Sequence, residues 1–246
     1  MSAELEVAVA GFAAWNPRAA ERPQPTILPP NERRRAPDTV AIALQVAQAA
    51  CANANREPAQ LPMVFASTYG DLAITDYMCS TLASAPTTLS PTRFHNSVHN
   101  AAAGYWSIAT GCRQPYCALG AGAYTFANGL FTAALQACAD GTDVLYVAYD
   151  SEARGVQTRI AHSHGMLGLA LVLTRAGGPC TLRLGILEQQ ATPQTAGDDA
   201  NAMADCLPLL VALERRADDR LRLPLGPDSV LQVQVRPDSG RGLRKD

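Results

Sequence analysis

The chain has 246 residues, of which 48% are hydrophobic and 17% charged, and its formal net charge is −2. This length fits one large domain or two small ones, and the small negative charge argues against electrostatic binding of nucleic acid or of an anionic membrane. No apolar segment reaches the roughly 20 residues that span a bilayer, and the first residues lack the pattern of a secretory signal, so we expect a soluble, cytoplasmic protein.

In the first half, alternating residues predict a strand over 4–11, and a second strand is expected over 62–67. Apolar residues on one face predict a helix over 39–54, and further helices are expected over 71–84 and 97–110. We expect Asp38 to cap the first of these helices. The segments 13–37 and 85–93 are rich in Pro and read as loops. The run Arg33-Arg34-Arg35 in the first loop is either a solvated turn or a contact for an anionic group or partner.

The second half predicts a strand, a corner and a helix over 115–139, further strands over 143–150, 165–175, 181–189 and 229–236, and a helix over 200–216. "DVLYVAYD" (143–150) is continuously apolar, as expected for a strand in a sheet covered on both faces. Strands that alternate with helices indicate an α/β layered fold. We expect one domain over 1–236 and a disordered tail over 237–246.

The seven cysteines include no CxxC pair and lie in apolar surroundings, so we expect buried, reduced thiols and no zinc site. We expect no metal and no cofactor. Lys245 is the only lysine, which leaves no plausible residue for Schiff-base chemistry. His95 and His99 stand four residues apart, and we favour packing or hydrogen bonding for them over metal binding.

A short stretch, "CALGAGAYTFANGL" (117–130), is typical of a buried strand that turns sharply into a helix. In many enzymes such a corner carries a Ser or Cys nucleophile at its tip. Here the tip holds only Gly120, Ala121, Gly122 and Ala123.

The preceding stretch, "SPTRFHNSVHNAAAGYWSIATGCRQP" (90–115), resembles the N-terminal half of β-ketoacyl synthases, condensing enzymes of the thiolase fold. The family's Ser-Pro, followed nine residues later by N-x-A-A-G-x-x-S-I-x-x-G-x-R-x-P, is matched without a gap from Ser90 to Pro115. More narrowly, 27–50 and 207–235 resemble stand-alone proteins of aryl polyene and related pigment pathways, which consist of this half alone. The resemblance implies a single ketosynthase half with a central mixed sheet layered by helices.

The resemblance also places the family's catalytic cysteine. It lies eight residues after the Pro of the R-x-P pattern and twenty before the Asp of "TDVLYVA", and both counts give Ala123. No Gln stands at 121–125, the residue that related chain length factors often carry there. The two assisting histidines belong to the family's second half, to which the resemblance does not extend, and His95, His99, His162 and His164 do not match them. Cys117 precedes the tip by six residues, so we do not expect it to act as a replacement nucleophile.

The resemblance therefore implies a non-catalytic, chain-length-factor-like partner of a full β-ketoacyl synthase, with the acyl carrier protein reached through that partner. Residues that would line or block the partner's tunnel are Phe94, Val98, Asn100, Tyr105 and Trp106, although Tyr105 and Trp106 could equally be ordinary interface or core aromatics. Two other hypotheses remain: a small thioester-processing hydrolase or decarboxylase, and a homodimeric acyl-binding scaffold.

Overall fold

A single mixed sheet organises the molecule. The computed structural model describes residues 4–15, 21–189 and 200–238, so the predicted tail lies outside them from residue 239 onward. In this part of the chain eight strands pair in the order β3-β2-β4-β5-β1-β6-β8-β7. They are β1 Leu5–Trp15, β2 Met63–Ala66, β3 Tyr116–Leu119, β4 Val144–Asp150, β5 Leu167–Thr174, β6 Cys180–Glu188, β7 Asp219–Gly226 and β8 Ser229–Pro237. Strand β2 pairs in parallel with β3 and β4, and every other pairing is antiparallel.

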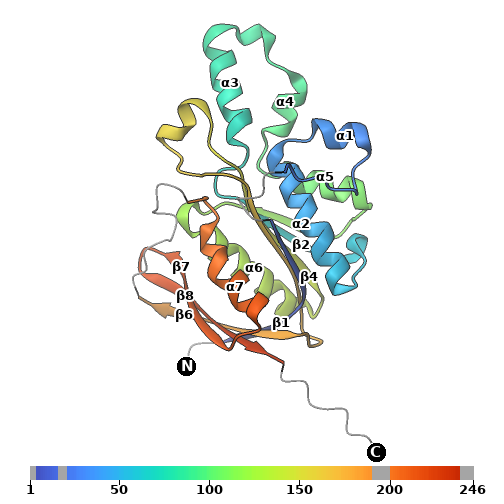
Figure 1. Cartoon of the computed structure of the whole chain (residues 1–246), viewed down its shortest axis with the longest axis vertical. Helices are drawn as coiled ribbons and strands as arrows, with labels where there is room; N and C mark the ends of the chain where they lie inside the picture. Colours follow the sequence, from blue (N-terminus) through green and yellow to red (C-terminus); the bar gives the residue numbers. More distant parts are fainter. Residues whose placement is uncertain (1–3, 16–20, 190–199, 239–246) are drawn as a thin grey trace, which may run out of the picture.

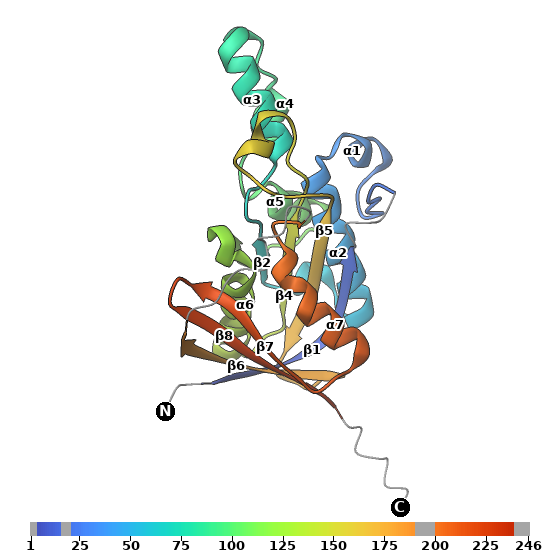
Figure 2. The same cartoon turned by 60° about the vertical axis from the view of Figure 1, so that its left-hand side comes forward.

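Helices cover both faces of this sheet (Figures 1 and 2). They are α1 Pro30–Arg35, α2 Asp38–Ala54, α3 Leu72–Ser84, α4 Pro91–Asn96, α5 Ala101–Thr110, α6 Thr125–Asp140 and α7 Leu207–Arg215. Single 3-10 turns occupy η1 Pro58–Gln60, η2 Pro86–Thr88, η3 Gly122–Tyr124, η4 Gly155–Arg159 and η6 Ala204–Cys206. Helices α2 and α5 pack on one face and α6 and α7 on the other.

Strand β4 shows why its sequence is apolar throughout. Its seven residues are all buried. Val144, Tyr146 and Ala148 pack in the core under α6, whereas Leu145, Val147 and Tyr149 pack in the core under α2. The predicted two-sided burial of this strand is therefore confirmed, as is the α/β layered architecture.

Helices α3 and α4 form a hairpin that projects beyond the carboxyl ends of β2, β3 and β4, and it is the topmost part of the chain in Figures 1 and 2. Part of this hairpin was predicted as a loop, because the Pro and Thr residues of 85–93 disguise η2 and the start of α4.

Strand β7 was also missed, because Pro224 and alternating charged residues hide its apolar positions. The predicted cap of α2 was wrong: Pro37 occupies the N-cap, and Asp38 is already helical and bonds Arg22 instead, with an Oδ1–Nε distance of 2.8 Å.

Candidate functional site

The corner predicted from 117–130 is present between β3 and α6. After Leu119 the chain turns through Gly122, whose φ of +55° lies in the left-handed region that glycine tolerates, and the 3-10 turn η3 then leads into α6. The hydroxyl of Thr125 holds the turn together, since it accepts from Ala121 N at 2.9 Å and donates to Gly122 O at 2.7 Å. Ala123 is exposed at the tip. The residue to which the family resemblance assigns the nucleophile is therefore an exposed alanine at the tip of the corner.

The imidazole of His99 lies beside this corner. Its Nε2 donates to Ser67 O, at the carboxyl end of β2, over 2.9 Å. A Cβ at Gly120 would lie 3.2 Å from both His99 Nε2 and Ser67 O, so the glycine leaves room for the ring. His99 is thus a hydrogen-bonding residue of the corner. His95 lies on α4, and His99 lies in the turn before α5.

A buried carboxylate supports the same edge of the sheet. Asp150, at the end of β4, is 1% exposed and accepts from Ser67 Oγ at 2.7 Å, Thr68 N at 2.8 Å and Tyr69 N at 3.3 Å. Burial raises the pKa of Asp150 to about 6, and the hydrogen bonds from Ser67, Thr68 and Tyr69 offset part of that rise. Sequence reasoning missed this residue, because an Asp at the end of an apolar strand reads as the start of a loop.

The five residues predicted to shape a partner's tunnel separate into two groups. Phe94 and Val98 are exposed by 57% and 49%, and Asn100 donates from Nδ2 to the hydroxyl of Tyr116 at 2.9 Å. Tyr105 is half-buried and donates to Asn96 Oδ1 at 3.2 Å. Trp106 has no exposed surface and packs in the core under α2 and α5, so it is a core aromatic that no partner can contact directly.

Exposed large apolar side chains stand on α4, in the turn before α5, on α5 and on β3. They are Phe94, Val98, Ile108 and Tyr116, and Ile108 is exposed by 83%. A cavity of about 530 Å³ between α1, α4 and α5 is lined by two of them, Val98 and Ile108. Strand β3 is an outer strand, and no other strand of the described chain pairs with its free edge. We call these four side chains and the free edge of β3 the α4–β3 surface.

The remaining candidate residues give no sign of a metal site. His95, His162 and His164 are exposed, and within 4–15, 21–189 and 200–238 no three His, Cys, Asp or Glu residues are grouped as metal ligands. Arg33, Arg34 and Arg35 form the last turn of α1 rather than a loop. Among the same residues, no helix is both long enough and apolar enough to cross a membrane.

The cysteines are only partly as predicted. All seven are free, but Cys79 is exposed and Cys117 and Cys138 are half-buried, which corrects the expectation that all are buried. Burial raises the pKa of the Cys51 thiol to about 12, with a smaller contribution from Glu57. Cys117 lies on β3 and packs against the core next to α6, away from the tip of the corner.

Comparison with solved structures places the fold. The chain is similar to a chain in the complex of the ketosynthase ApeO with its chain length factor ApeC from Xenorhabdus doucetiae, with 20% identity, a TM-score of 0.74, and coverage of 94% of this chain and 99% of that one. It is also similar to the ishigamide ketosynthase/chain length factor (13% identity, TM-score 0.69, coverage 95% and 99%). A third match is to AntDE:AntF, a type II polyketide synthase acyl-carrier protein in complex with its ketosynthase (11% identity, TM-score 0.70, coverage 96% and 100%).

Sequence comparison identifies the family directly. No curated protein matches the chain. The family model of the β-ketoacyl synthase N-terminal domain, however, matches residues 11–223, which is most of the chain. Together with the mixed sheet and the corner at Ala123, this match shows that the chain belongs to the β-ketoacyl synthase N-terminal domain family.

Proposed function

We propose that this chain is a chain-length-factor-like subunit that pairs with a full β-ketoacyl-acyl-carrier-protein synthase and shapes its acyl tunnel. The observation that carries the proposal is the retained corner with Ala123 at its tip. The similar structures are of ketosynthases with a chain length factor or a carrier protein, which supports a role in the same kind of assembly. Within that role we assign the chain to the synthesis of a polyketide or fatty-acid-like product of the aryl polyene type.

The chemistry at the corner favours a partner over a condensing enzyme. A condensing cysteine forms a thioester, and the helix end and nearby backbone N–H groups stabilise its thiolate and the oxyanion. A methyl group at position 123 cannot form that bond. The neighbouring hydroxyl of Thr125 is buried and used in two hydrogen bonds within the turn, so it is not a substitute nucleophile.

The α4–β3 surface supports a protein partner. Large apolar side chains rarely gather on the exposed surface of a soluble monomer unless another molecule covers them. The free edge of β3 adds unpaired backbone donors and acceptors, which a strand of a partner can satisfy. We therefore place the ketosynthase on this surface and propose that Phe94 and Val98, which project from it, limit the length of the growing chain.

The partner proposal is tested by co-expression with a full β-ketoacyl synthase from the same organism. We expect a 1:1 complex on size-exclusion chromatography. Ile108→Asp should disrupt it, because it places a charge on the α4–β3 surface. Val211→Asp is the matched control, since Val211 is exposed by 40% on α7 at the other face of the sheet. A chain that remains a homodimer beside that ketosynthase would falsify the proposal.

The length-setting proposal is tested on the assembled complex. Phe94→Ala and Val98→Ala should lengthen the products found by mass spectrometry, because each removes bulk from the α4–β3 surface. Leu135→Ala, which removes a side chain exposed by 47% on α6 at the other face of the sheet, should leave the profile unchanged. Identical products from all variants would exclude these side chains as length limits.

Labelling with iodoacetamide addresses the thioester-processing hypothesis: one hyper-reactive cysteine whose loss abolishes a measured activity would establish it.

A further inference from the structure

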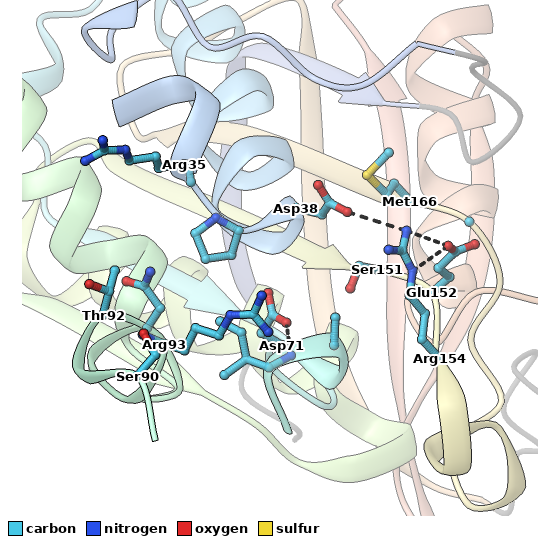
Figure 3. Close-up of a pocket in the computed structure, with 16 residues that line it drawn as sticks. Arg35, Asp38, Asp71, Ser90, Thr92, Arg93, Ser151, Glu152, Arg154 and Met166 are labelled. Atoms are coloured by element: carbon cyan, nitrogen blue, oxygen red, sulfur yellow. Dashed lines mark hydrogen bonds and ion pairs between the residues drawn. The ribbon is translucent and has the colours of Figure 1, made fainter. Parts of the chain in front are cut away.

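A second cavity, of about 720 Å³, lies at the base of the α3–α4 hairpin, residues 72–96. Figure 3 shows residues of the hairpin on one side of it, with Ser90, Thr92 and Arg93 labelled, and residues that follow β4 on the other. The end of α1 and the start of α2 complete the lining. The hairpin is therefore one wall of the cavity, and its position decides how far the cavity is open.

Very little apolar packing attaches this hairpin to the rest of the chain. None of residues 75–95 is buried, and neither of the two cores of the molecule includes a residue of 72–96. The buried residues of the hairpin are Leu72 and Ile74, at the start of α3, and Asn96, at the end of α4. A segment with few buried apolar contacts opens at a lower free energy than the core does, so the hairpin can open while the sheet stays folded.

The two helices of the hairpin are nevertheless joined to each other. The hydroxyl of Tyr77, on α3, accepts from Ser90 N at the start of α4 over 3.0 Å. The guanidinium of Arg93, on α4, stacks 4.0 Å from the ring centroid of the same tyrosine. Movement of the hairpin as one unit keeps these contacts, whereas separate movement of α3 or α4 breaks them.

Fixed residues on either side mark where the hairpin can turn. Before α3, the carboxylate of Asp150 holds Thr68 N and Tyr69 N, and the next residue, Gly70, has a φ of +65°. After α4, the imidazole of His99 is bonded to the end of β2. A Cβ at Gly70 would lie 3.7 Å from His99 Cδ2, so both ends of the hairpin leave the sheet side by side. Short connections of this kind absorb the backbone rotation in hinge motions.

Polar contacts close the hairpin against the elements around it. The hydroxyl of Thr39, on α2, donates to Asp71 Oδ2 at 2.7 Å, and a backbone N–H of η4 donates to Asp76 Oδ1 at 3.3 Å. Tyr105, on α5, donates to Asn96 Oδ1 at 3.2 Å. Single hydrogen bonds contribute little net free energy, so these contacts close the hairpin without fixing it. We propose that the α3–α4 hairpin is a hinged lid, which opens as one unit and controls access to the 720 Å³ cavity.

Hydrogen exchange of the full chain, read by peptide mass spectrometry, tests whether the hairpin opens as a unit; this test does not depend on the partner assignment. We expect the amides of α3 and α4 to be less protected than those of β4 and β5 by about a hundredfold or more, and to similar degrees in both helices. Helix α2 should stay protected. Equal protection of the hairpin and of β4 and β5 would overturn the proposal. Protection that falls gradually towards η2 would do the same, since it indicates fraying from the tip.

A labelling experiment tests whether the opening controls the cavity. Ser151→Cys places a thiol in the cavity lining, at a position that is 6% exposed, and iodoacetamide modification of that thiol is followed by peptide mass spectrometry. In this background Thr39→Val should raise the rate about threefold or more, because it removes the hydrogen bond to Asp71. Thr174→Val is the matched control: Thr174 is also buried, and its hydroxyl accepts one hydrogen bond at the opposite end of β5.

The buried thiol of Cys51, on α2, separates lid opening from global unfolding in the same samples. We expect its labelling to be equally slow in both threonine variants. Equal rates at the introduced thiol in Thr39→Val and Thr174→Val would overturn the lid, as would an increase in Thr39→Val that Cys51 shares.

Discussion

The buried carboxylate of Asp150 makes a specific prediction for stability against pH. Its pKa is raised from an ordinary value of 3.8 to about 6, because the group is buried and no described Arg or His forms an ion pair with it. The folded chain therefore holds the proton more tightly than the unfolded chain between pH 4 and 6. The contribution of Asp150 to the free energy of unfolding is full only well below about pH 4 and is lost as the pH rises through 6.

The size of this effect follows from the shift. One pKa unit corresponds to about 1.4 kcal/mol, so a rise of about two units corresponds to about 3 kcal/mol at neutral pH. Other carboxylates titrate in the same range, so the quantity to measure is the difference between the wild type and Asp150→Asn in urea unfolding from pH 4 to 7.5. We expect the difference in the free energy of unfolding, wild type minus Asp150→Asn, to fall by about 2 kcal/mol over that range, since part of the loss already occurs below pH 4.

A second variant changes the position of this transition. Ser67→Ala removes the 2.7 Å hydrogen bond that stabilises the charged carboxylate. The pKa of Asp150 should then rise further, and the loss of stability should move to higher pH. If the difference in the free energy of unfolding between the wild type and Asp150→Asn stays constant or rises with pH, the account of Asp150 as a destabilised buried charge is refuted.

Three further substitutions test the packing around the site by urea denaturation. Trp106→Ala should cost about 3–5 kcal/mol because the side chain is fully buried, and a cost below about 1 kcal/mol would contradict its place in the core. Gly129→Ala should destabilise the fold by about 1–3 kcal/mol, because the new Cβ would lie 2.7 Å from the ring of Tyr146; a more stable variant would show that α6 can move away from β4. Asp71→Ala should cost about 1 kcal/mol through loss of the α3 cap, while Asp71→Asn should lose less; equal losses would point to the bond with Thr39 instead.

Local patterns were sufficient to predict the sheet and the corner. Seven of the eight strands were anticipated, because residues such as those of β4 are apolar over the whole strand and are bounded by Asp or Gly. The resemblance to β-ketoacyl synthases supplied the position of Ala123, because two counts along the family's motifs both end at this residue. The strands, in contrast, were predicted from residues that are close together in the chain, where the spacing of side chains directly reflects the backbone.

The polar sites depend on contacts that no local pattern contains. Asp150 bonds residues that precede it by more than eighty positions, and Ser151 lies in a cavity with Arg93 from α4. Tryptophan is a residue type that often occurs at interfaces, yet the position of Trp106 on the inner side of α5 places it in the core. The direction of the Trp106 side chain depends on how α5 packs against α2. The sequence around Trp106 does not specify that packing.

The corner itself can be explained without catalysis. Strands β3 and β4 both run parallel to β2, so the chain between them must cross over through a helix, and α6 provides that crossover. Gly122 and the two hydrogen bonds of Thr125 form the turn that makes this possible, and none of them requires a thiol at position 123. The fold thus preserves the backbone of the corner for structural reasons, whereas only thioester chemistry would preserve a cysteine. An exposed alanine at the tip of the corner is therefore compatible with the fold, and it agrees with the partner role that we propose.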